Sequence, residues 1–147
     1  MNTALGKKIE ELIPKRLDEI ITIKRDRFSL SWANENGFAE FPSVVTLMDG
    51  QKPVKATLNE WRIVCFTNPR RTSYFLTGFK SSTDNPLATS EIKAVDFKQK
   101  IVLTNNSLYR LGTKGEGEAD IHILLCICHC FHSWGMGNAL GILPVFY

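Results

Sequence analysis

The first part of the chain carries an apolar stripe with helical spacing. Its members recur every three or four positions, and charged residues fill the intervals between Leu5, Ile9, Leu12, Ile13, Leu17, Ile20 and Ile21. This spacing predicts an amphipathic helix over residues 5–21 that covers a sheet. Pro14 removes one backbone hydrogen bond, so we expect a kink there or two short helices that meet there. A groove on a partner is the alternative destination of the apolar face.

After residue 27 apolar and polar positions alternate, which is the period of a β-strand. Phe28, Leu30 and Trp32 alternate with serines, and the turn-forming string NENG separates them from FAEF at residues 38–41. This pattern predicts a hairpin. Runs rich in β-branched and aromatic residues predict further strands at residues 43–48, 54–58, 60–67 and 72–79.

The second half of the chain continues with strands and then a helix. Polar residues and Pro86 predict a loop over residues 81–90, and residues 91–112 have the pattern of a three-strand meander. Acidic residues at 116, 118 and 120 favour a helix N-terminus, and Gly135 provides a stop, so we place a helix over residues 119–133. The apolar residues 139–147 are expected to dock on the core.

These elements predict one α+β domain over residues 1–147. We expect an antiparallel sheet of about five to seven strands, flanked by the N-terminal helix and by the helix near the C-terminus. The chain has 147 residues, of which 44% are hydrophobic and 22% charged, as is usual for a globular domain with its own core.

Charge and cysteine usage indicate in which compartment the protein works and which partners it does not require. The net charge of +3 is too small to require a polyanionic partner. The first residues lack a continuous apolar run of the secretory type, and the longest apolar run falls short of the roughly 20 residues that span a bilayer. Three of the four cysteines sit at alternate positions in one segment, a poor layout for disulfides. We therefore expect a cytoplasmic protein with free thiols and no membrane contact.

The segment CICHCFH at residues 126–132 is the densest group of metal-ligating and nucleophilic side chains. On a helix that turns about 100° per residue, one sector of about 100° holds His122, Cys126, His129, Cys130 and Ser133. The opposite side holds Leu124, Ile127, Cys128 and Phe131. If the segment is helical, its cysteines and histidines therefore point to different sides of the helix and do not form one site.

Zinc is the cofactor alternative at this face, with His122, Cys126, His129 and Cys130 as its ligand candidates. One straight helix presents only pairs of ligands to a point, and the segment has none of the usual zinc-finger spacings. A cysteine nucleophile is also disfavoured, because Cys126 lies in mid-helix, away from the dipole end that lowers a thiol pKa. We expect no cofactor and inert thiols, and we leave enzymatic activity undecided with the balance against it.

A second group of residues is typical of binding surfaces. Residues 62–80 mix cationic and aromatic side chains, and the contact candidates are Arg62, Arg70, Arg71, Tyr74 and Lys80. Arginine and tyrosine anchor many protein interfaces. The same residue types also pair with phosphates and stack on bases, so nucleic acid is the alternative partner of the region around Arg62, Arg70 and Arg71.

The leading functional hypothesis is a small non-enzymatic binding or inhibitory module that acts through contact with another protein, because no catalytic motif is present. Accessory proteins of mobile elements, such as immunity proteins and inhibitors of host defence, are of this kind. The alternatives are a metal- or thiol-dependent protein centred on residues 122–132 and a nucleic-acid binder. A homodimer through the exposed face of the last helix is also compatible with the sequence.

Overall fold

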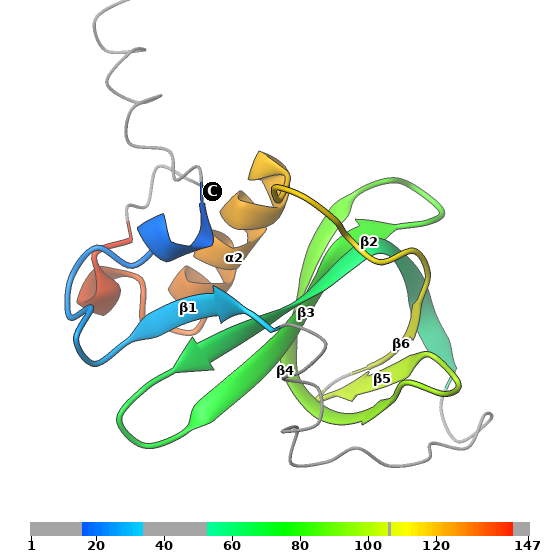
Figure 1. Cartoon of the computed structure of the whole chain (residues 1–147), viewed down its shortest axis with the longest axis horizontal. Helices are drawn as coiled ribbons and strands as arrows, with labels where there is room; N and C mark the ends of the chain where they lie inside the picture. The colour runs from blue at the N-terminus through cyan, green and yellow to red at the C-terminus, as the bar shows by residue number, and fades with distance from the viewer. Residues whose placement is uncertain (1–15, 34–52, 106, 143–147) are drawn as a thin grey trace, which may run out of the picture.

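In the part of the chain that the structure describes, six strands form one sheet in which each of these strands pairs with the next one. The computed structural model describes residues 16–33, 53–105 and 107–142. The strands are β1 (Ser29–Trp32), β2 (Val54–Thr67), β3 (Thr72–Lys80), β4 (Pro86–Asp96), β5 (Ile101–Thr104) and β6 (Leu108–Leu111). Successive strands are antiparallel. The first part of β2 also pairs in parallel with β6, so β2 to β6 close into a barrel with β1 added beside β2 (Figure 1).

A β-bulge allows β2 to serve two neighbours in different directions. Asn59 pairs with Phe79 and Arg62 pairs with Thr77, so two residues of β2 face Gly78 alone. Glu60 in this bulge has a φ of 51°. A Cβ atom on Gly78 would lie 3.0 Å from the carbonyl oxygen of Asn59. Bulges bend and twist a strand, and here the bend carries the start of β2 across to β6.

The barrel encloses one of two apolar clusters. Its buried members come from all five barrel strands and are Leu58, Trp61, Ile63, Leu76, Val95, Val102, Tyr109 and Leu111. They follow the alternation expected of strands with one face inward. The barrel interior is thus filled with side chains, which makes it a core rather than a channel.

The second apolar cluster lies outside the barrel, between the sheet and a layer of helical segments. The layer consists of α2 (Ile121–Ser133) and the two 3₁₀ turns η1 (Leu17–Glu19) and η3 (Asn138–Leu140). The buried members of this second cluster are Leu17, Ile20, Ile21, Leu30, Val64, Phe66, Phe75, Ile123, Leu124, Ile127, Cys128, Phe131, Leu140 and Ile142. No helix in residues 16–33, 53–105 and 107–142 is long and apolar enough to cross a membrane.

The sheet and the helix near the C-terminus agree with the α+β class expected from the sequence, but the N-terminal helix does not extend as predicted. Residues 5–15 lie outside the described residues. From Leu17 onward the stripe forms only the single turn η1, preceded by an extended Arg16. Leu17, Ile20 and Ile21 are all buried. Ile20 is still helical, but the backbone N–H groups of Thr22 and Ile23 donate to the Leu140 carbonyl and not within a helix. The apolar residues of the stripe are therefore buried here without an α-helix.

The strand boundaries also differ from the prediction. The two strands expected at residues 54–58 and 60–67 are one strand, because the bulge interrupts the pattern without ending the pairing. The loop expected over residues 81–90 ends at residue 85, and Pro86 begins β4. A proline is tolerated at the first residue of a strand. The strands expected at residues 38–41 and 43–48 lie outside the described residues.

Candidate functional site

Helix α2 carries the cysteines and histidines, and both of its ends are capped by the chain itself. The Asp120 carboxylate accepts the backbone N–H of His122 at 2.8 Å and the ring Nδ1–H of the same residue at 2.8 Å. These hydrogen bonds lower the pKa of Asp120, the backbone one most. At the other end Gly135 has a φ of 79°, and its N–H donates to the carbonyl of His132. The left-handed residue that follows the helix suits glycine.

The two sides of α2 have different surroundings. Leu124, Ile127, Cys128 and Phe131 are at most 4% exposed and belong to the outer core. His122 and His129 are exposed, whereas Cys126 and Cys130 are half-buried. The cysteines and histidines that the sequence places on one sector therefore meet both solvent and the edge of the sheet.

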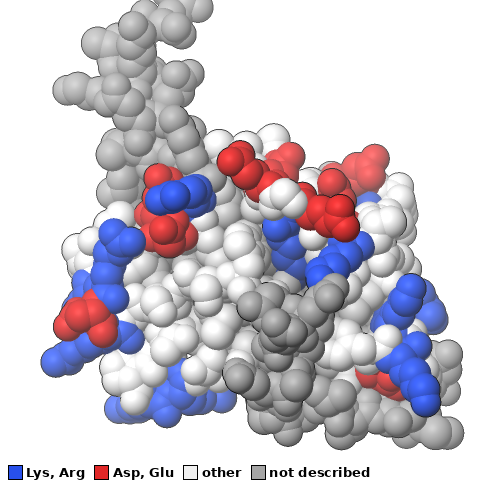
Figure 2. Space-filling model, in the orientation of Figure 1, with Lys and Arg blue, Asp and Glu red and all other residues white. Residues whose placement is uncertain are grey.

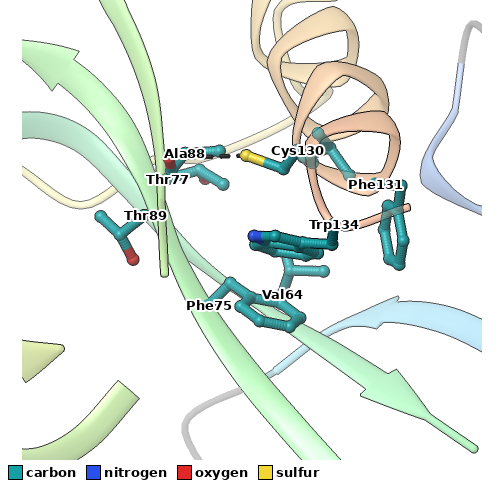
Figure 3. Close-up of a pocket in the computed structure, with 9 residues that line it drawn as sticks. Val64, Phe75, Thr77, Ala88, Thr89, Cys130, Phe131 and Trp134 are labelled. Atoms are coloured by element: carbon teal, nitrogen blue, oxygen red, sulfur yellow. Dashed lines mark hydrogen bonds between the residues drawn. The ribbon is translucent and has the colours of Figure 1, made fainter. Parts of the chain in front are cut away.

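A groove runs between this face of α2 and the beginning of β4. It measures about 360 Å³, and its walls are Pro86, Leu87 and Ala88 from the strand and Leu125, Cys126, His129 and Cys130 from the helix. The Cys130 thiol donates a hydrogen bond to the Ala88 carbonyl at 3.6 Å (Figure 3). We call this space the α2–β4 groove.

The floor beside the α2–β4 groove is closely packed. Beneath Cys130 a space of only about 10 Å³ remains among Val64, Phe75, Thr77, Ala88, Thr89, Ile127, Phe131 and Trp134. Figure 3 shows Trp134 lying over Phe75, and the two ring centroids are 4.8 Å apart. Trp134 nevertheless remains 37% exposed. The helix is thus fixed to the sheet, and the groove is a feature of its outer side.

The thiols on α2 are held in their neutral form. Burial raises the pKa of Cys126. Burial, together with repulsion from a charged Cys126, raises the pKa of Cys130 to about 11, and burial raises that of Cys128 to about 12. Because the thiolate is the form that attacks substrates and binds metals, none of these thiols is activated at neutral pH.

The metal candidates are not gathered around one point. Within the described part of the chain, no group of three or more histidine, cysteine, aspartate or glutamate side chains is placed to hold a metal ion. His122 turns to Asp120 at the start of the helix. Cys126, His129 and Cys130 share the α2–β4 groove with aliphatic side chains. Cys126, His129 and Cys130, which the sequence suggests as metal ligands, are therefore part of a largely apolar wall in the fold.

The five contact candidates are spread over the molecule. Arg62 donates from Nη2 to the carbonyls of Glu116 and Gly117, both at 2.9 Å. Arg70 and Arg71 lie in the turn between β2 and β3, and Tyr74 packs partly against the barrel core. Lys80 ends β3 at the opposite end of that strand. Only Arg70 and Arg71 are neighbours, so the fold does not unite the five in one surface.

Two features escaped the sequence patterns. The first is the α2–β4 groove, which depends on where α2 lies on the sheet. The second is the position of the cations at residues 24–27, which the pairing of Ser29 with Thr67 brings to the same end of the sheet as Arg70 and Arg71. Residues 24–27 and residues 70–71 are far apart in the sequence, and only the strand register shows that they are neighbours.

Comparison with protein-family models, with curated proteins and with solved structures finds no match for this chain.

Proposed function

We propose that the chain is a non-enzymatic binding module whose α2–β4 groove receives an apolar side chain of a partner protein. The observation that carries this proposal is the lining of the groove. Pro86, Leu87, Ala88 and Leu125 supply aliphatic walls, and the thiols beside them are uncharged at neutral pH. A concave apolar surface at the edge of a packed core suits a buried anchor residue of a protein interface.

The state of the thiols favours binding over catalysis. A cysteine nucleophile needs a lowered pKa and a neighbouring base, whereas burial raises the pKa of Cys126 and of Cys130. The Cys130 thiol is occupied by the Ala88 carbonyl. A wall of neutral thiols is compatible with an apolar guest, because cysteine behaves there as a small hydrophobe.

We place this module in the cytoplasm, among small inhibitory proteins that act by surface contact. The four cysteines are free in the structure, which fits a reducing compartment. Accessory proteins of mobile elements, such as immunity proteins and inhibitors of host defence, are the class we propose. Their activity consists of occupying a partner, so it needs no catalytic group.

The test is capture of partners from the native host with the wild type and two matched variants. Leu125→Glu places a charge in the α2–β4 groove, and Ile121→Glu places the same charge on the same helix at a residue that is 40% exposed and lies outside the groove. We expect one protein to be captured by the wild type and by Ile121→Glu but not by Leu125→Glu. The two purified proteins should then form a binary complex that Leu125→Glu weakens at least about tenfold.

Several results would contradict the proposal. A complex that Leu125→Glu leaves unchanged would remove the groove from the interface. A dimer of the chain that only Leu125→Glu dissociates would make a second copy the occupant. Stoichiometric zinc in untagged protein, lost on substitution of Cys126 and His129, would instead favour the metal-dependent alternative.

A further inference from the structure

Two cationic turns lie at the same end of the sheet although they are more than forty residues apart in sequence. Residues 24–27 lead into β1, and residues 68–71 connect β2 to β3. Ser29 pairs with Thr67, and Thr67 pairs with Thr72, so the two turns extend beyond the same strand ends. Lys93 on β4 also belongs to this region. Its ammonium group forms an ion pair with Glu91, and Glu91 lies opposite Phe75 of β3 in the strand register. We call this region the basic end.

The basic end has more cations than anions. Its cations are Lys24, Arg25, Arg27, Arg70, Arg71 and Lys93, and its anions are Asp26 and Glu91. These six cations and two anions give an excess of four positive charges, whereas the whole chain has an excess of three. The rest of the chain is therefore slightly negative, and the basic end is not a sample of a uniformly basic surface.

Acidic residues gather elsewhere. Glu116, Glu118 and Asp120 lie in the exposed segment that leads into α2. Figure 2 shows red side chains along the top of the molecule over this segment. Blue side chains lie at the left and lower left, over the start of β1 and the turn between β2 and β3, with some red ones among them, and further blue side chains lie at the right. The acidic segment before α2 and the basic end are thus two different surfaces, and an anionic partner is attracted to the basic end and repelled by the acidic segment.

The cations of the basic end are held by backbone geometry but remain available to a ligand. The side chain of Asn68 accepts the backbone N–H groups of Arg70 and Arg71 at 2.9 and 3.0 Å and so shapes their turn. Arg71 and Lys93 share the Glu91 carboxylate at 3.1 and 3.4 Å. Within the described residues, the side chains of Lys24, Arg27 and Arg70 make no hydrogen bond or ion pair. Fixed turns with unpaired cationic tips are suited to phosphate oxygens.

We propose that the basic end binds the backbone of single-stranded nucleic acid. The cations lie before β1, in the turn between β2 and β3, and at Lys93 within β4, so they cross four neighbouring strands, and at the usual strand spacing this row spans about 14 Å. That length covers roughly four phosphates at the spacing along one stacked strand. Trp134 borders the row, because it lies on Phe75, which pairs with Glu91. An exposed aromatic ring beside a cationic track is the arrangement that binds unpaired bases.

A nucleic-acid strand fits these observations better than an acidic protein does. The cations form a row that crosses successive strands, which matches a ligand whose charges repeat along a line. The basic end contains none of the residues that line the α2–β4 groove. The proposal is therefore independent of the proposed protein contact, and either one can fail alone.

The test measures binding of fluorescein-labelled oligothymidine and oligouridine, each of twelve nucleotides, to the full chain by fluorescence anisotropy. The variant Arg70→Ala/Arg71→Ala removes two cations from the basic end. The control Lys55→Ala/Lys98→Ala removes two exposed cations from outside it. We expect the first variant to weaken binding at least about tenfold and to make the salt dependence shallower by about 1.4, at roughly 0.7 per lost phosphate contact. The control and Leu125→Glu should bind like the wild type.

Further arms identify the class of ligand. Emission from Trp134, assigned with the Trp134→Phe variant, should fall when either oligonucleotide binds. Equal losses in the two double variants, or no binding at 50 millimolar salt, would overturn the proposal as non-specific attraction. A twelve-residue glutamate peptide that displaces the oligonucleotide at equal charge would identify the basic end as a surface for acidic proteins. A duplex that binds as tightly as the single strands, without a change in Trp134 emission, would overturn the single-strand assignment.

Discussion

The guanidinium group of Arg62 lies over the indole ring of Trp32, with its central carbon 5.4 Å from the ring centroid. The same group donates to the carbonyls of Glu116 and Gly117. Arg62 therefore joins three separate segments: β1, the bend of β2 and the glycine-rich segment before α2. A residue that resembles a ligand-binding cation in the sequence has a structural role in the fold.

We expect Arg62→Ala to lower the free energy of unfolding by about 2 kcal/mol, because two charge-assisted hydrogen bonds and a cation–π contact are lost. Arg62→Lys should recover less than half of this, since a lysine cannot donate from a planar fork. Urea denaturation measures both changes. Arg70→Ala, at an exposed turn, should change stability by no more than about 0.5 kcal/mol. An Arg62→Ala variant as stable as this control would refute the joining role.

Gly78 allows the bulge in β2 to approach β3. A methyl group on it would lie 3.0 Å from both the Asn59 carbonyl oxygen and the Leu58 Cβ atom, and these atoms are fixed by the barrel. We expect Gly78→Ala to destabilise the fold by about 1–3 kcal/mol, as overpacking usually does. Ser81→Ala, in the exposed turn after β3, is the control and should be nearly neutral. Thermal unfolding of the two variants side by side decides whether the close approach matters.

The sequence predicted the local elements better than their assembly. The apolar pattern identified β3 and the helix near the C-terminus, because each has a clear period and its own turn or cap residues. It divided β2 in two, because the bulge at Glu60 and Trp61 interrupts alternation without ending the strand. Closure of the barrel by β2 and β6 joins segments about fifty residues apart, and no local pattern encodes such a pairing.

The candidate sites show the same division. Helical geometry separated Cys128 from Cys126 and Cys130, since this depends only on the rotation per residue. The groove beside Cys126 depends on the position of Pro86 and Ala88 against the helix, which is a tertiary fact. Likewise, residues 62–80 are continuous in sequence, but the alternation of strand faces and the length of β3 separate Arg71 from Tyr74 and Lys80.

Asp120 starts α2 by capping it, so Asp120→Ala should destabilise the protein by about 1 kcal/mol, and Asp120→Asn should retain most of the stability. The pH dependence distinguishes a charged cap from a merely polar one. The pKa of Asp120 in the folded protein lies below the ordinary 3.8. A lowered pKa means that the carboxylate contributes stability above the unfolded pKa and loses it as the pH falls through the folded one.

The stability difference between the wild type and Asp120→Asn should therefore shift against the wild type below about pH 4. Denaturant titrations at several pH values measure it. The same difference at pH 3 and at pH 7 would show that the charge on Asp120 adds nothing to its capping hydrogen bonds.

The thiols of α2 should differ in reactivity in a way that tests the apolar character of the α2–β4 groove. Burial raises the pKa of Cys128 to about 12 and that of Cys130 to about 11, from the ordinary 9.0. The thiolate fractions at neutral pH are then lower than that of a free cysteine by about a thousandfold and about a hundredfold. Alkylation by iodoacetamide at pH 7.5, located by peptide mass spectrometry, should leave Cys128 unmodified until the protein unfolds and should modify Cys130 slowly.

An apolar compound that occupies the α2–β4 groove should slow the reaction of Cys126 and Cys130 but not that of Cys65, which lies on β2. Alkylation of Cys126 faster than that of a free cysteine would show an activated thiol, and the groove would then have to be considered a reactive site rather than a receptor for an apolar side chain.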